Sequence, residues 1–230
     1  MTKSRKDQFY AVLTGDIVGS TRFMGTERKK LYDCITQASK KLAEAFPQSI
    51  PLVPAIFRGD SWQVLVKNPS KSLRIALYFR ALLKSCNAGI AGKRIDSRIA
   101  IGIGTIDFLP PREVSSGDGE AYRLSGDGLD KMPKAHRMAI SFPPRMKASA
   151  ECQAMLVIIK LIDSLAGKWT EGQARAVCGA LLGYTQKATA SKCFTPEISQ
   201  QAVSQHLERA GWDSISPALD FFEAHIHDRP

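Results

Sequence analysis

The stretch Phe9-Tyr-Ala-Val-Leu-Thr-Gly-Asp-Ile-Val-Gly-Ser-Thr21 gives the first indication of the fold. Its apolar run ends in Gly-Asp, which predicts a buried strand that carries the carboxylate of Asp16 at its end. The small and hydroxylated segment that follows can begin a helix or point backbone N–H groups at an anion. Gly19, Ser20 and Thr21 are therefore candidate phosphate ligands, and the alternative is that they only cap a helix.

A second Gly-Asp pair, Gly59-Asp60, follows 44 residues after the first, between two strand-like segments. If the two strands are neighbours, Asp16 and Asp60 can together hold a hard divalent cation such as Mg²⁺, shared with a polyphosphate. The alternative is that both acids are turn residues, since Asp forms local hydrogen bonds in turns. Arg58 is either a phosphate ligand or a solvated side chain.

The elements expected over residues 1–145 follow the order strand, helix, hairpin, helix, strand, loop, helix, strand. Helical spacing covers Thr26–Phe46 and Leu73–Cys86, the hairpin joins Ala55–Phe57 to Trp62–Val66, and Arg98–Ile106 is a continuous apolar strand. This order predicts an α+β fold: a ferredoxin-like palm with a mainly antiparallel sheet and helices on one face.

Residues 150–230 are predicted to be entirely helical and to form a second, small all-α domain. Two of these helices have the pattern of a helix-turn-helix, and they are expected over Tyr184–Lys192 and Ile198–Ala210. The second exposes serine and glutamine side chains, which can bond to base edges or phosphates. The candidate DNA contacts are Ser199, Gln200, Gln201, Ser204 and Gln205. Such modules also serve protein contacts, so that alternative stays open.

Charge is distributed unevenly along the 230 residues. The net charge is +10, with 32 basic and 22 acidic residues. The first 149 residues hold 25 Lys and Arg against 13 Asp and Glu, so the positive field belongs to the palm. A basic surface suits an anionic ligand such as a nucleotide or a nucleic acid, although a solvated surface is equally compatible.

The five cysteines are widely spread and form no C-x-x-C pair, which argues against a zinc site and favours a reduced, cytoplasmic protein. The polar start of the chain does not resemble a signal peptide, and no apolar run is long enough to span a membrane.

Together, these segments resemble known families. Val12-Leu-Thr-Gly-Asp-Ile-Val-Gly-Ser-Thr21, Gly59-Asp60 and Arg98-Ile-Ala-Ile-Gly-Ile-Gly104 resemble the metal motifs and glycine-rich strand of class III nucleotidyl cyclases. The order of Gly15–Ser20, Asp118–Tyr122, Trp169–Gln173, Tyr184–Gln186 and Ser199–Leu207 resembles the bacterial SatD family, which pairs such a palm with a helix-turn-helix.

The cyclase resemblance implies a site that binds a nucleoside triphosphate with Mg²⁺ or Mn²⁺, in a homodimer. It assigns Asp16, Ile17 and Asp60 to the metal. The helix after the glycine-rich strand, where active cyclases carry an Asn and an Arg, has no Asn, and Arg123 is its only cation. Arg123 is therefore the candidate catalytic residue, which would stabilise charge on the transferring phosphoryl group.

Two functions follow from this interpretation. The first is a regulator in which the palm binds a nucleotide and the helical part contacts DNA. The second is an active nucleotidyl cyclase or nucleotidyltransferase that makes a cyclic nucleotide signal from a nucleoside triphosphate.

Overall fold

The computed structural model describes residues 8–57, 59–86, 94–109, 111 and 113–226. At its centre lies a five-stranded sheet in the order β2-β3-β1-β4-β5. The strands are β1 (Tyr10–Ile17), β2 (Ala55–Phe57), β3 (Ser61–Val66), β4 (Ser97–Gly104) and β5 (Met138–Ser141). Neighbouring strands are antiparallel, except that β5 runs parallel to β4. The mixed α+β fold and the mainly antiparallel sheet confirm the prediction.

Three longer helices belong to the palm: α1 (Thr26–Ala45), α2 (Ser72–Ser85) and α3 (Glu120–Asp130). Three short 3₁₀ helices join them: η2 (Ser20–Arg22), η3 (Pro69–Lys71) and η4 (Val114–Ser116). The expected helix Thr26–Phe46 and the expected hairpin both form close to their predicted bounds. The helix boundaries follow the apolar spacing, since Leu31, Ile35 and Leu42 of α1 are all buried.

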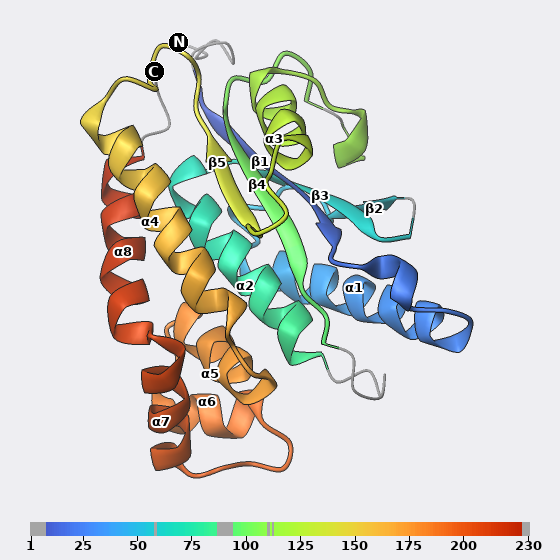
Figure 1. Ribbon diagram of the computed structural model, residues 1–230, viewed down its shortest axis with the longest axis vertical. Coiled ribbons are helices and arrows are strands. Elements are labelled where there is room, and N and C mark those ends of the chain that lie inside the picture. The colour runs from blue at the N-terminus through green and yellow to red at the C-terminus, as the bar shows by residue number, and fades with distance from the viewer. Residues whose placement is uncertain (1–7, 58, 87–93, 110, 112, 227–230) are drawn as a thin grey trace.

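The prediction that all helices cover one face of the sheet is wrong. α1 and α2 lie on one side and α3 lies on the other (Figure 1). Ala11 and Leu13 of β1 face the larger core, whereas Tyr10 and Val12 belong to a second, smaller core together with Ala121 of α3. This explains why β1 is a continuous apolar run, because both of its faces are buried.

Glycine in β4 allows α3 to approach the sheet so closely. A Cβ atom on Gly102 would lie 2.3 Å from the carbonyl oxygen of Ala121 and 2.4 Å from the amide nitrogen of Ser125. Only a residue without a side chain fits beneath the helix backbone at this point.

The helical part contains α4 (Ala150–Gly167), α5 (Glu171–Leu181), α6 (Gln186–Cys193), α7 (Gln200–Ala210) and α8 (Trp212–His225). Polar residues cap four of these helices. Thr170 forms the predicted capping box with Gln173, and Ser149, Thr185 and Ser199 accept a hydrogen bond from the backbone of the first turn. The all-helical prediction is confirmed for the described part of residues 150–230.

The helical part packs against the palm through α2 (Figure 1). One continuous cluster of buried side chains contains Phe79 of α2, Ile159 of α4, Val177 of α5 and Phe222 of α8. A smaller cluster joins α5, α6 and α7. The division into domains at 1–145 and 150–230 stays a prediction, and the two parts share a core.

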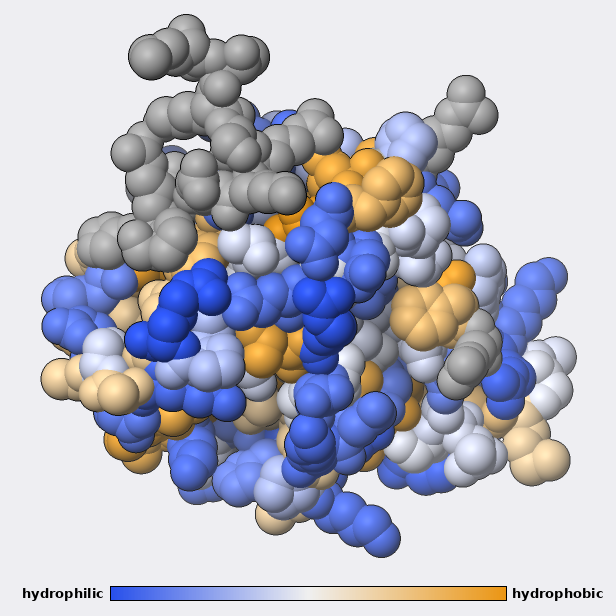
Figure 2. Space-filling model, turned by 90° about the horizontal axis from the view of Figure 1, so that it is seen from above, coloured by the Kyte–Doolittle hydropathy of each residue, from blue (hydrophilic) through white to orange (hydrophobic). Residues whose placement is uncertain are grey.

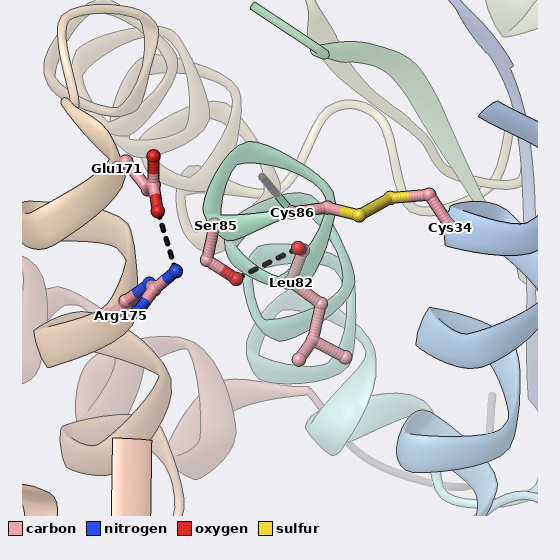
Figure 3. Close-up of a disulfide and its surroundings, with 6 residues drawn as sticks. All are labelled: Cys34, Leu82, Ser85, Cys86, Glu171 and Arg175. Atoms are coloured by element: carbon pink, nitrogen blue, oxygen red, sulfur yellow. Dashed lines mark hydrogen bonds and ion pairs between the residues drawn. A yellow bond between two sulfur atoms is a disulfide. The ribbon is translucent and has the colours of Figure 1, made fainter. Parts of the chain in front are cut away.

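The expectation of reduced thiols is wrong for one pair. Cys34 of α1 and Cys86, the residue after α2, form a disulfide with a Cα–Cα distance of 6.3 Å. Figure 3 shows the bond bridging the end of α2 to α1, with α5 on the other side of α2. The pair was not visible in the sequence because 52 residues separate the cysteines. Cys152, Cys178 and Cys193 are free.

The face of the molecule shown in Figure 2 is mainly polar. Seen from above, hydrophilic residues dominate and hydrophobic ones form small separate patches (Figure 2). Among the described helices, none combines the length and apolar character needed to cross a bilayer.

Candidate functional site

The two Gly-Asp motifs come together where the central strand β1 ends and β3 begins. Asp16, near the end of β1, is the cross-strand partner of Ser61, and the amide of Ile17 donates a 3.1 Å hydrogen bond to the carbonyl oxygen of Asp60. Gly59 adopts φ of +83°, which forms the turn before Asp60. The backbones of Asp16 and Asp60, which are distant in the sequence, are therefore adjacent, as expected, with Asp60 in the turn before β3.

The backbone at Asp16 is held rigidly. A Cβ atom on Gly15 would lie 2.3 Å from Cζ2 of Trp62 and 2.4 Å from the carbonyl oxygen of Arg98, so glycine is required here. Trp62 is fully buried and donates to Ser97 Oγ at 3.0 Å. The Ser97 hydroxyl in turn donates to the carbonyl oxygen of Asp16 at 2.6 Å.

The Asp16 carboxylate is bound by Arg98 of β4, its direct cross-strand neighbour on the other side. Arg98 Nε donates to Oδ1 at 2.9 Å, and Nη2 donates to Oδ2. The hydrogen bond to Asp16 raises the pKa of the Arg98 guanidinium, and partial burial opposes that shift. This two-point contact is the geometry in which arginine binds carboxylates most strongly.

Asp60 has a different partner. The Ser20 hydroxyl donates to its Oδ2 at 2.5 Å. Gly19 has φ of 62° and begins the 3₁₀ turn η2, so the segment after β1 is a tight turn, and Thr21 is exposed on it. Arg58, a candidate phosphate ligand from the sequence, lies outside the described residues.

Asp16 and Asp60 each supply carboxylate oxygens, the ligand type that a hard cation prefers, at this end of β1. Within the described residues no cluster of three or more His, Cys, Asp and Glu side chains is suited to a metal ion. Both oxygens of Asp16 are already engaged by Arg98. A cation that binds Asp16 would therefore compete with the Arg98 guanidinium for this carboxylate.

Arg123, the candidate catalytic residue, lies far from Asp16 of the same chain. β4 runs from Arg98 beside Asp16 to Gly104 beside Tyr10, and α3 begins at that far end. Arg123 lies in the first turn of α3, where it pairs with Asp118 at 2.9 Å and Asp107 at 3.1 Å.

A short polar row connects α3 to the middle of the sheet on the same face as Asp16. The hydroxyls of Thr14 and Ser125 are 2.8 Å apart and buried, and Gln63 donates to Thr14 Oγ1 at 3.1 Å. Gln63 and Ser61 are two residues apart on β3, so their side chains lie on the same face of the sheet. This row therefore lies beside the row formed by Arg98, Asp16 and Ser61.

A buried cluster of charged side chains is connected to the candidate site through Asp96. Arg80 of α2 is fully buried and binds Asp96 through Nε at 2.8 Å and Asp163 of α4 through Nη1 at 2.7 Å. The backbone carbonyl of Asp96 accepts a 2.9 Å hydrogen bond from Val18, two residues beyond Asp16. The helical part is thus linked to the candidate site through two ion pairs and one backbone hydrogen bond.

The candidate DNA contacts lie on and just before α7. Gln201, Ser204 and Gln205 are exposed, whereas the Ser199 side chain caps the helix by accepting from Ala202. Gln200 is exposed too, and its side chain bonds to Gln186 of α6 at 3.4 Å.

Sequence reasoning missed Arg98 and Arg80. In the sequence, Arg98 is only the first residue of an apolar strand. Its partner depends on the β1–β4 register, which pairs it with Asp16. The signal that could have found Arg80 is a lone arginine on an otherwise apolar stretch of a helix.

No family model and no curated protein matches the chain. Among solved structures, the chain is similar to the catalytic core of a rhodopsin-guanylyl cyclase with converted specificity, in complex with ATPαS. The two are 16% identical, the match covers 61% of this chain and 81% of the other, and the TM-score is 0.46. It is also similar to the guanylyl cyclase Cya2, at 14% identity, covering 61% and 77% of the two chains, with a TM-score of 0.43. These are distant likenesses, and no residue role follows from them.

Proposed function

We propose that the palm binds a nucleoside triphosphate together with Mg²⁺ or Mn²⁺ at the end of β1, where Asp16 and Asp60 meet. The observation that carries this proposal is the meeting of the two Gly-Asp motifs where β1 ends and β3 begins, beside the turn Gly19–Thr21. The carboxylates and the Ile17 carbonyl would hold the cation, and the cation would neutralise the phosphates when bound. The basic residues of the first 149 positions favour the same anionic ligand.

We further propose that the palm senses the nucleotide and that the helical part, a SatD-like helix-turn-helix, passes the signal to DNA. The exposed side chains of α7 and the contact between α2 and α5 support this role. The outer face of α7 has few cations, and phosphate neutralisation dominates DNA affinity. A homodimer, which would double the contact surface, is part of the proposal.

Catalysis is the second candidate, favoured by the same pair of acids. In that case Arg123 would have to act on a nucleotide held by another copy of the chain, because it lies at the opposite end of β1 from Asp16.

One experiment separates the two candidates. The purified protein is incubated with each nucleoside triphosphate and Mn²⁺, and both the thermal midpoint and pyrophosphate release are measured. We expect stabilisation without release, and loss of the stabilisation in Asp16→Asn and Asp60→Asn. The control is Asp33→Asn, an exposed acid of α1. Pyrophosphate release that disappears in Asp16→Asn would instead establish the enzyme, and no shift with any nucleotide would rule out both.

DNA binding is tested separately by fluorescence anisotropy on duplex DNA at several salt concentrations. We expect salt-sensitive binding that is weakened by Gln201→Ala combined with Gln205→Ala, and unchanged by Gln48→Ala, an exposed glutamine after α1. Equal binding by both variants would remove α7 from the interface.

A further inference from the structure

The Arg98–Asp16 pair is placed where the proposed cation would bind. Asp16 has two carboxylate oxygens, and Arg98 donates to each of them. A guanidinium in this position supplies positive charge to the same oxygens that a divalent cation needs. The guanidinium and a cation therefore compete for Asp16, because like charges that lie close together repel and Arg98 already neutralises the carboxylate.

We propose that Arg98 is a built-in counter-cation that blocks Asp16 until a polyphosphate draws the guanidinium away, so that nucleotide binding prepares the cation site. This inference rests on the proposed function and adds the order of events to it. Guanidinium binds phosphate and carboxylate oxygens with the same two-point geometry, so a triphosphate is a suitable second partner for Arg98.

The surroundings allow the side chain to move while its backbone stays fixed. The Arg98 carbonyl oxygen is packed against Gly15 and accepts from Ser97 Oγ at 3.0 Å. The Arg98 side chain, in contrast, is 31% exposed to solvent, and the Asp16 side chain is 23% exposed. Both side chains therefore reach solvent, so Arg98 can change partners without disturbing the core.

A second acid also acts on the Arg98 guanidinium. Asp130, at the end of α3, is exposed and interacts electrostatically with Arg98. It can stabilise Arg98 after the guanidinium has left Asp16.

The proposal makes two opposite predictions for Arg98→Gln in the full-length chain. Without nucleotide, Mn²⁺ should bind about fivefold more tightly or better, because Asp16 is released. Without metal, in EDTA, nucleoside triphosphate should bind more weakly by a similar factor, because the phosphate has lost its guanidinium. Manganese binding is measured by electron paramagnetic resonance and nucleotide binding by calorimetry, so neither readout depends on turnover.

Matched variants control the experiment. Arg98→Lys keeps the charge but loses the two-point contact, and we expect intermediate values. Arg145→Gln removes an arginine from a comparable partly exposed pair with Glu120, and both affinities should stay at wild-type values. Thermal unfolding of each variant checks that the fold is retained, and Arg98→Lys provides the test if Arg98→Gln does not fold.

The outcomes separate this inference from the proposed function. Wild-type and Arg98→Gln proteins that bind Mn²⁺ equally, with binding lost in Asp16→Asn, would overturn the counter-cation and leave the nucleotide site intact. Weaker Mn²⁺ binding in Arg98→Gln would also overturn it. Failure of all proteins, wild type included, to bind either Mn²⁺ or nucleotide would overturn the proposed function and this inference with it.

Discussion

Arg80 is the residue on which the packing of the two parts depends most. Its guanidinium has no exposed surface, and both of its acidic partners come from other elements. Asp163 also accepts from the backbone amide of Arg137, at 2.8 Å, so its charge is satisfied from two directions. Removing one member of a buried group of charges leaves the others without compensation, which costs more than the pairing itself contributes.

Substitution of Arg80 by leucine should therefore destabilise the protein severely. We expect a loss of about 3–5 kcal/mol in the free energy of unfolding, because Asp163 and Asp96 lose their buried partner. Urea denaturation followed by circular dichroism measures the loss. Arg145→Gln, from a partly exposed pair, should change the stability by about 1 kcal/mol or less, and a similar small loss in Arg80→Leu would contradict the account.

The same cluster predicts a pH dependence. Burial alone would raise the pKa of Asp96, but its hydrogen bonds to Arg80 and its proximity to Lys84 lower that pKa below its ordinary value of 3.8. The stabilisation by Asp96 is therefore complete above the unfolded value and lost as the pH falls through the lower, folded value. Asp96→Asn should flatten the decline in stability below about pH 4, as measured by thermal unfolding across pH. An unchanged acid limb in this variant would assign the decline to other groups.

Among the elements, α3 packs against the sheet with its backbone in direct contact. It lies directly on β4, with the backbones in contact at Gly102, and its own Gly126 has open space around it. Gly102 lies in the contact between α3 and β4, whereas Gly126 lies on α3 away from that contact. One is required by the close approach, and the other only lowers the helix propensity.

Alanine at these two positions should have opposite effects. Gly102→Ala would force α3 away from the sheet and destabilise the fold by about 1–3 kcal/mol. Gly126→Ala meets no atom within 4 Å and should stabilise by about 0.5–1 kcal/mol, as expected inside a helix. Denaturant unfolding of both variants checks the pair, and equal effects would show that α3 does not pack as described.

The comparison of sequence and structure also belongs to the scale of elements. Helix and strand bounds followed from apolar spacing, and the meeting of Asp16 with Asp60 followed from the order of elements. The face covered by α3 did not, because a strand buried on both sides has no alternation to reveal its two environments. Arg98 was missed for a related reason. Its role depends on the register between β1 and β4, which no local pattern specifies.

At the scale of the whole molecule, the sheet, α2 and the helical part behave as one packed body. α2 contributes to the core on the palm side through Phe79, and its end is fixed to α1 by the Cys34–Cys86 bond (Figure 3). α8 is attached to the start of α2 by Glu223, which pairs with Lys71 and Arg74 at 2.5 Å each.

Reduction of the disulfide should lower stability without changing the fold. Closing a loop of 52 residues contributes about 4 kcal/mol in the chain-entropy account. We expect dithiothreitol to lower the thermal midpoint of the wild-type protein, and Cys34→Ser to show the reduced value in both conditions. Cys193→Ser, a free cysteine, should respond to dithiothreitol as the wild type does. A wild-type midpoint that ignores the reductant would contradict a stabilising bond.

The position of α2 has a practical consequence for anyone who wishes to isolate the palm. A truncation after Pro144 removes α4, α5 and α8, and so uncovers the surface of α2 that packs against α5 and leaves Arg80 without Asp163. We expect that fragment to aggregate on expression, and limited proteolysis of the intact chain to yield no stable palm-sized product. Nucleotide binding should therefore be studied in the intact polypeptide.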